Sequence, residues 1–204
     1  MRDSRAKRIF FIALAVCFAL ITFLFARRSV DAQMAIEQEY PRVNRSLSLD
    51  DGAGGVIRVE GEGKLYADDL KAMLKTAGIS SKNVKHVIIG DEITEIGYMT
   101  FYRLKYLKTL KLGAGVVRVT PGALKSCASL EWLYFPAGLK DIGQDFLYGC
   151  DDCRVVSDAP AEALPPMENV GDSARVFAGV DSYEALRKRV GKEISLPKAL
   201  ARWW

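Results

Sequence analysis

The residues of this sequence that could support catalysis are one histidine and a pair of cysteines. His86 is the only histidine, while Cys150 and Cys153 form a C-x-x-C pair. A nucleophilic cysteine needs a histidine within hydrogen-bond reach, and a C-x-x-C pair can act in redox chemistry or supply half of a zinc site. A structural zinc site needs four ligands, and no second pair with zinc-ligand spacing occurs in the sequence. Whether His86 can meet a thiol depends on the fold.

A 23-residue repeat, which starts at Val84, predicts that fold. Six sets of apolar residues share this spacing: Val84/Leu107/Leu130/Cys153, Val87/Leu110/Leu133/Val156, Ile89/Leu112/Phe135, Ile93/Val116/Leu139, Ile96/Val119/Ile142 and Phe101/Leu124/Leu147. A single coil of this length cannot bury its apolar side, whereas stacked coils place equivalent residues above one another. The sequence therefore predicts a repeat solenoid of three coils over 84–157.

Each coil is expected to combine short strands with a turn or short helix. The alternation of Val87 and Ile89 predicts a strand, and residues 98–104 predict a helical or turn segment. Helices are expected over 68–77 and 181–190. They would cover the two ends of the solenoid, because terminal coils need polar caps.

The repeat resembles a known family. The stretches that carry the resemblance are VKHVIIGDEITEIGYMTFYRLKYL, LKTLKLGAGVVRVTPGALKSCASL and LEWLYFPAGLKDIGQDFLYGC. They are similar to BspA-type leucine-rich repeats, with Pro136 at the proline of the family, Gly97 and Gly143 at its glycine, and Cys127 and Cys150 at its cysteine. The resemblance covers Val84–Ser157. It implies a leucine-rich-repeat solenoid and a role in surface adhesion or partner binding, commonly in bacteria that live with a host.

The repeat register separates the histidine from the thiols. His86 is equivalent to Thr109 and Trp132 on the outward side of a strand, whereas Cys150 is equivalent to Cys127 in a column expected to be buried. A cysteine–histidine pair is therefore not expected, and the sequence predicts no enzyme, no cofactor and no metal site. Buried thiols and a structural disulfide, with a Cys127–Cys150 bridge between neighbouring coils, both fit Cys127, Cys150 and Cys153. A redox or metal pair is the less favoured alternative.

The outward side of the predicted strands supplies a candidate partner-binding surface. It consists of His86 and Ile88 in the first coil, Thr109 and Lys111 in the second, and Trp132 and Tyr134 in the third. Clusters of exposed aromatic residues often mark interfaces. The alternative is that a terminal segment, either the one with Trp203 and Trp204 or the strip 160–167, covers these residues.

The N-terminal region predicts a membrane segment. Residues 9–26 form an apolar run that would span roughly 27 Å as a helix, enough for a bilayer core. More basic residues precede the run than follow it, so the N-terminus is expected in the cytoplasm and the body outside it. Two hypotheses remain open: an uncleaved signal-anchor, or a signal peptide cleaved after Ala32 that releases a secreted protein.

The charge distribution argues against a nucleic-acid partner. The chain of 204 residues has a net charge of +4, of which residues 1–30 contribute 6 − 1 = +5 and the remainder −1. A nucleic-acid-binding body would carry a basic face. The partner is therefore expected to be a protein or a host or surface ligand.

Five regions follow from these patterns. They are a cytoplasmic tail with the transmembrane anchor (1–30), a stalk or linker (31–55), an N-terminal cap (56–83), the leucine-rich repeat (84–157) and a C-terminal cap and tail (158–204). The predicted function is an exported, membrane-anchored recognition module that binds a protein. The alternative is a structural or assembly subunit of a cell-envelope complex.

Overall fold

The computed structural model describes residues 46–50, 56–166, 175–191 and 194–204, which belong to one compact unit. Within these ranges no helix has both the length and the apolar character needed to cross a bilayer. The predicted membrane segment 9–26 and its cleavage site after Ala32 lie outside the described residues.

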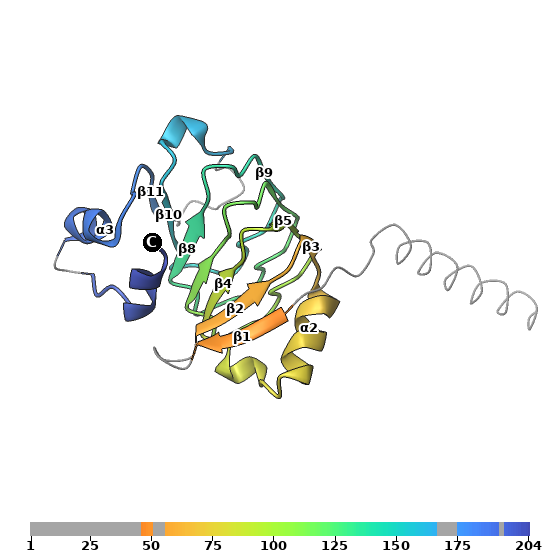
Figure 1. Ribbon diagram of the computed structural model, residues 1–204. Helices are drawn as coiled ribbons and strands as arrows, with labels where there is room; N and C mark the ends of the chain where they lie inside the picture. The colour runs from red at the N-terminus through yellow and green to blue at the C-terminus, as the bar shows by residue number, and fades with distance from the viewer. Residues whose placement is uncertain (1–45, 51–55, 167–174, 192–193) are drawn as a thin grey trace, which may run out of the picture. The chain divides into compact units, whose positions relative to one another are not determined.

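The 23-residue repeat folds as the coils of a solenoid, which confirms the predicted repeat fold (Figure 1). Strands β4 (His86–Ile89), β6 (Thr109–Lys111) and β8 (Trp132–Phe135) lie parallel. Val87, Leu110 and Leu133 are in register across them. All three side chains are fully buried. Equivalent residues of successive coils therefore form ladders in the core, as the period predicts.

Two sheets, parallel except at the N-terminal edge of the larger one, form two sides of the solenoid. Among the described residues, the large sheet has seven strands in the order β1-β2-β4-β6-β8-β10-β11, and the small sheet has four in the order β3-β5-β7-β9. The strands of the large sheet are β1 (Ser46–Asp50), β2 (Val56–Glu60), β4 (His86–Ile89), β6 (Thr109–Lys111), β8 (Trp132–Phe135), β10 (Arg154–Ser157) and β11 (Arg175–Phe177). Those of the small sheet are β3 (Gly63–Leu65), β5 (Ile93–Ile96), β7 (Arg118–Val119) and β9 (Asp141–Ile142).

Turn segments form the third side. They span residues 97–107, 120–130 and 143–153, and backbone hydrogen bonds join each to the next, for example from Phe101 N–H to the Ala123 carbonyl (2.9 Å). Two positions in each segment adopt positive φ, and both recur with the period of the repeat: Met99/Gly122/Asp145 and Arg103/Ser126/Gly149. The backbone of the turns thus repeats as regularly as the strands do.

The solenoid begins earlier than the sequence predicted. Strands β2 and β3 pair in parallel with β4 and β5, so the predicted N-terminal cap contributes a coil of its own. Ile57 is in register with Val87, and this coil is longer than the repeat period because it contains helix α2 (Ala67–Thr76) and the short 3-10 helix Ser81–Asn83. Residues 46–50, expected in the stalk, instead form β1, which pairs antiparallel with β2.

The repeat register also slips by one position at its C-terminal end. Leu133 is in register with Val155 rather than with Val156, which the period makes its equivalent. Since neighbouring residues of a strand face opposite sides, Val155 lies in the solenoid core and Val156 faces outward. The prediction that placed Val156 in the core column was wrong for this reason.

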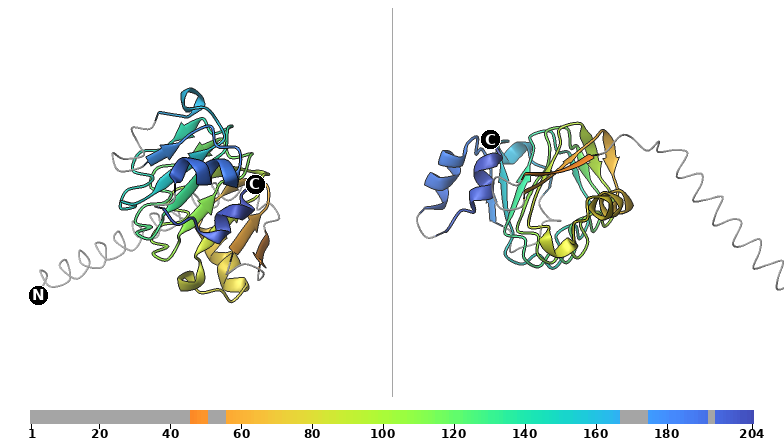
Figure 2. Two further views of the ribbon diagram at one scale, coloured as in Figure 1. Left: turned by 90° about the vertical axis from the view of Figure 1, so that its left-hand side faces the viewer. Right: turned by 60° about the horizontal axis from the view of Figure 1, so that its bottom comes forward.

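The C-terminal segment, defined here as residues 175–191 and 194–204, packs on the outside of the large sheet. Strand β11 extends that sheet beside β10, and helix α3 (Tyr183–Val190) and the 3-10 helix Lys198–Arg202 lie over its outer face (Figure 2). A third 3-10 helix, Ala161–Ala163, precedes β11. Helix α3 forms where a helix was expected, begins at the capping hydroxyl of Ser182 and ends at Gly191. It covers a face of the solenoid, whereas the sequence suggested that it would cover an end.

Candidate partner-binding site

The six residues of the predicted binding surface do share one face. Strands β4, β6 and β8 place His86 beside Thr109 and Thr109 beside Trp132, while Lys111 is in register with both Ile88 and Tyr134. We call the outer side of the large sheet the strand face. The register predicted from the repeat is therefore confirmed at these positions.

The strand face is buried, so of the two arrangements left open by the sequence the covered one is present and the exposed one is not. Ile88, Thr109, Trp132 and Tyr134 are at most 7% exposed, and His86 and Lys111 are half-buried. The apolar residues of the strand face form a second cluster with the C-terminal segment, whose members there are Val180, Leu186, Ala199, Leu200 and Trp203. The physical reason is that both surfaces are apolar, and each removes the other from water.

Trp203 and Trp204 contact this face directly. The Trp203 ring packs edge-on against the Tyr134 ring at 5.8 Å between centroids, and Trp204 packs against Tyr134 at 6.2 Å. The Lys111 ammonium donates a hydrogen bond to the Trp203 carbonyl and lies 5.3 Å from the centre of the Tyr134 ring. The structure therefore matches the alternative in which the segment with Trp203 and Trp204 covers the strand face.

The titrating groups of the strand face are shifted toward their neutral forms. Burial lowers the pKa of Lys111, and burial together with Asp158 raises the pKa of Tyr134. Burial also lowers the pKa of His86, and the positive charge of Lys108 adds to this effect. The largest cause of each shift is the cost of a charge in a medium of low polarity.

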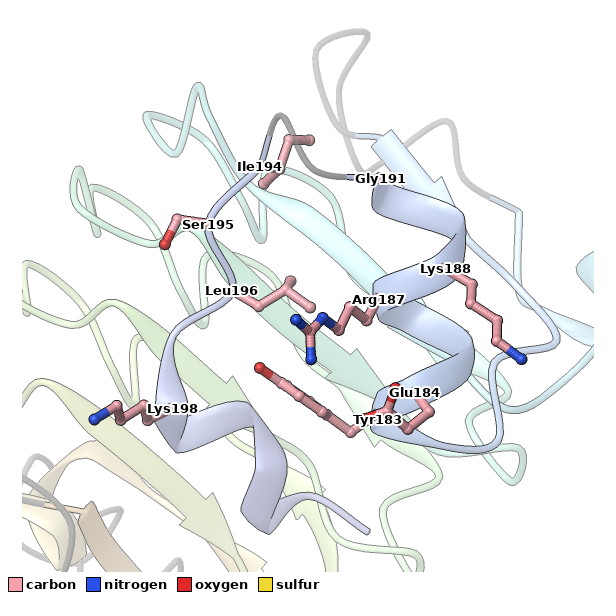
Figure 3. Close-up of a pocket in the computed structure, with 9 residues that line it drawn as sticks. All are labelled: Tyr183, Glu184, Arg187, Lys188, Gly191, Ile194, Ser195, Leu196 and Lys198. Atoms are coloured by element: carbon pink, nitrogen blue, oxygen red, sulfur yellow. The ribbon is translucent and has the colours of Figure 1, made fainter.

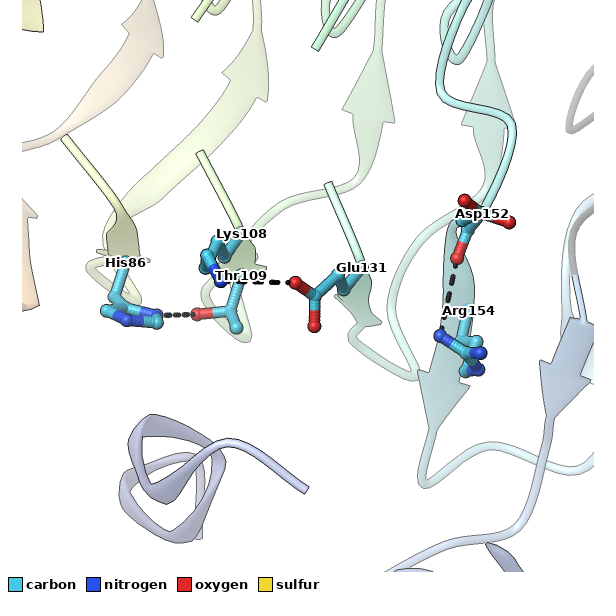
Figure 4. A network of polar contacts seen from close by, with 6 residues as sticks. All are labelled: His86, Lys108, Thr109, Glu131, Asp152 and Arg154. Carbon is cyan, nitrogen blue, oxygen red and sulfur yellow. Dashed lines mark hydrogen bonds and ion pairs between the residues drawn. The ribbon is translucent and has the colours of Figure 1, made fainter. Parts of the chain in front are cut away.

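A row of polar residues borders the face where the strands begin (Figure 4). His86 Nδ1 lies 3.0 Å from the Thr109 hydroxyl, and the Lys108 ammonium lies 3.4 Å from the Glu131 carboxylate. His86 thus makes a structural hydrogen bond with Thr109.

The three cysteines of the described chain are free, buried thiols. Cys127 Sγ donates to the Phe101 carbonyl (2.9 Å), and Cys150 Sγ donates to the Leu124 carbonyl (3.2 Å), in each case one coil back. Burial raises the pKa of the Cys153 thiol well above its ordinary value, which disfavours the reactive thiolate. Within the described ranges no group of His, Cys, Asp and Glu residues is placed to hold a metal ion.

A different surface carries exposed aromatic residues. Tyr98 and Tyr148, on the turn segments, are 59% and 62% exposed. Tyr102, Lys125 and Tyr148 occupy equivalent positions of three coils, and the Lys125 ammonium lies 4.7 Å from the centre of the Tyr148 ring. We call the surface formed by Tyr98, Tyr102, Lys125 and Tyr148 the turn face.

A comparison with known families agrees with the repeat. A model of the BspA type leucine rich repeat region, in six copies, matches residues 76–158. The chain carries a BspA-type leucine-rich repeat region. A crystal structure of a leucine-rich repeat protein from Eubacterium ventriosum ATCC 27560 is similar, with a TM-score of 0.40 and 16% sequence identity over 69% of this chain and 43% of that one. No match was found among curated proteins.

The turn face of this leucine-rich repeat region was missed from the sequence, although the same period contains it. The column Tyr102/Lys125/Tyr148 has the 23-residue spacing of the core columns. This column is harder to recognise because a strand shows an alternating apolar pattern, whereas a turn has no such periodic pattern. The recurrence of aromatic or cationic residues at one position of successive turns could have indicated the turn face.

Proposed function

We propose that this leucine-rich repeat protein is an exported, membrane-anchored recognition module that binds a protein partner through its turn face. The observation that carries the proposal is the pair of exposed tyrosines on the turns, Tyr98 and Tyr148, with the partly buried Tyr102 and Lys125 beside them. Tyrosine supplies a large, stiff contact surface and is enriched where proteins meet. Because the turn segments are joined by backbone hydrogen bonds, these residues are held ready before a partner arrives.

The strand face supports this proposal in a less direct way. Its aromatic residues are occupied by the C-terminal segment, so a partner reaches them only if that segment leaves. The turn face needs no such rearrangement, since Tyr98 and Tyr148 are exposed in the structure as it stands.

Photo-crosslinking of the full chain in cells tests the proposal. A photoreactive phenylalanine analogue replaces Tyr148, and in a matched control it replaces Val117, which is 41% exposed but lies outside the turn face, beside β7 of the small sheet. We expect a protein adduct from position 148 and none from position 117, and Lys125→Glu should weaken the adduct. Adducts of equal strength at both positions, or none at position 148, would remove the turn face as the binding surface.

The identity of the adduct separates two roles. A host protein favours recognition at the cell surface. A membrane protein of the same cell favours the assembly role in a cell-envelope complex. The turn face would then still be the binding surface, but for assembly rather than for recognition of a host.

Export is tested independently. A reporter fused after Trp204 is expected to be active only outside the cytoplasm, because basic residues before the apolar run 9–26 hold the N-terminus inside. Sequencing of the mature N-terminus then distinguishes the anchor from a protein that begins at Gln33 after cleavage.

A further inference from the structure

The C-terminal segment forms a cleft between helix α3 and the chain at 194–198. The cleft has a volume of about 710 Å³, within the range of about 300–1,000 Å³ of ligand-binding pockets. Figure 3 shows the Arg187 guanidinium and the Tyr183 ring reaching from α3 into this space, with Leu196 opposite them. Glu184, Lys188, Ser195 and Lys198 also line the cleft, which thus presents several polar groups beside an apolar wall.

Two polar groups of the cleft, on Arg187 and Tyr183, are of interest for binding. Among the described residues, neither the Arg187 guanidinium nor the Tyr183 hydroxyl has a hydrogen-bond or ion-pair partner. By contrast, the neighbouring Arg189 donates to the Ala178 carbonyl and has a structural role. Arg187 thus lies near a second donor, and no contact with another described residue occupies its guanidinium.

The charge of the C-terminal part of the chain differs from that of the rest of the body. Residues 175–204 contain seven Lys and Arg against three Asp and Glu, a net charge of +4. Residues 31–174 contain 16 Lys and Arg against 21 Asp and Glu, a net charge of −5. The apolar side of the C-terminal segment packs on the strand face, so these basic residues are not needed for that packing.

From the cleft and its charge we infer the kind of segment that it binds. We propose that the cleft takes an acidic segment of the partner protein, with a carboxylate on Arg187 and Tyr183 and an apolar neighbour against Leu196. This inference rests on the proposed function and names the chemistry of the partner. A guanidinium and a nearby hydroxyl donate together to a carboxylate, and such charge-assisted bonds are among the stronger ones.

The apolar wall decides between a peptide and a lipid surface. A basic surface attracts an anionic membrane through charge alone and needs no cleft. Here Leu196 and Ile194 line the cleft with Arg187, which fits a chain that carries acidic and apolar side chains close together. Glu184 also lines the cleft, and its negative charge should weaken the binding of an anion. Removal of this charge is therefore expected to change the affinity in the opposite direction to removal of Arg187.

Fluorescence anisotropy on the full chain in zwitterionic detergent tests this site. The probe is a labelled peptide that alternates glutamate and leucine, and its control alternates glutamine and leucine. We expect the glutamate peptide to bind, Arg187→Gln to weaken it at least about tenfold, and Glu184→Gln to strengthen it. The double change Lys71→Gln with Lys75→Gln, on exposed positions of α2, is the matched control and should leave the affinity within about twofold.

Other outcomes would overturn the inference. Equal binding of both peptides, or an affinity that Arg187→Gln leaves unchanged, would exclude carboxylate recognition in the cleft. So would binding of short-chain phosphatidylglycerol that depends on Arg187 when the glutamate peptide does not bind, because the cleft would then serve a lipid headgroup. A crosslinked partner at position 148 that persists in the Arg187→Gln chain would reject this inference alone, and the proposed function would stand.

Discussion

The strand face and the turn face are built by the same 23-residue repeat, yet they meet different surroundings. The strand face carries Ile88, Trp132 and Tyr134 and lies under the C-terminal segment. The turn face carries tyrosines beside Lys125, and two of them, Tyr98 and Tyr148, remain exposed to solvent. An outward position within a coil therefore does not decide exposure, because a segment distant in sequence can cover one side of the solenoid and leave another open.

The largest effect should come from the core that both faces share. Leu110→Asp places a carboxylate in a fully buried ladder with no partner, and such a charge is very costly. We expect the chain to lose its cooperative unfolding transition, measured by circular dichroism on heating. Val117→Asp introduces the same charge at an exposed position and should leave the midpoint within a few degrees. A normal midpoint for Leu110→Asp would contradict the register of the repeat.

The next effect separates the two faces. Trp132→Ala removes a fully buried aromatic ring from the strand face and should lower the free energy of unfolding by about 3–5 kcal/mol. Tyr148→Ala removes a ring that is 62% exposed on the turn face and should cost about 0.5 kcal/mol. Urea unfolding of the two full-length variants measures the difference. Similar losses for both would mean that the two faces are equally buried, and the contrast between them would fail.

The repeat core and the cover of the strand face differ in how far sequence could predict them. Columns such as Val87/Leu110/Leu133 recur at a fixed spacing, and stacking is the one way to bury them all, so the solenoid follows from the period. The slip that turns Val156 outward has no such signal, because a coil shortened by one position leaves the apolar pattern intact.

The exposure of the predicted binding surface was harder to predict, because it depends on both the strand face and the C-terminal segment that covers it. His86, Lys111 and Trp132 were placed correctly on one face by the repeat. Leu200 and Trp203 belong to the same apolar cluster as this face. The repeat does not predict this contact, because both residues lie far beyond β8 in the sequence. The apolar side of α3, which includes the fully buried Leu186, needed a surface to cover, and the sequence did not distinguish the end of the solenoid from its side.

A smaller effect tests the backbone that holds the turn face. Gly122 has a φ of 66° in a column whose other members, Met99 and Asp145, adopt similar angles. Gly122→Ala should cost about 1 kcal/mol because a side chain disfavours this conformation, while an added Cβ there meets only ordinary contacts. Asp145→Gly relieves the same strain and should be neutral or stabilising. Urea midpoints of the two variants should therefore move apart, and a loss with Asp145→Gly larger than that with Gly122→Ala would show that the turns need their side chains more than their geometry.

The smallest effect concerns pH, and it should arise at the strand face alone. Burial and Lys108 lower the pKa of His86 below its ordinary value of 6.5. The unfolded chain therefore takes up a proton at this residue before the folded chain does. The contribution of His86 to the free energy of unfolding is thus greatest above pH 6.5 and declines as the pH falls below it. The decline ends once the pH passes below the pKa of the folded state. His86→Gln keeps a polar side chain beside the Thr109 hydroxyl and should flatten the profile in the range below pH 6.5 relative to the parent. Tyr148→Phe, on the turn face, should leave the profile of the parent unchanged. A slope in this window that survives His86→Gln would mean that another group of the chain titrates there, and the strand face would no longer be the source of the pH dependence.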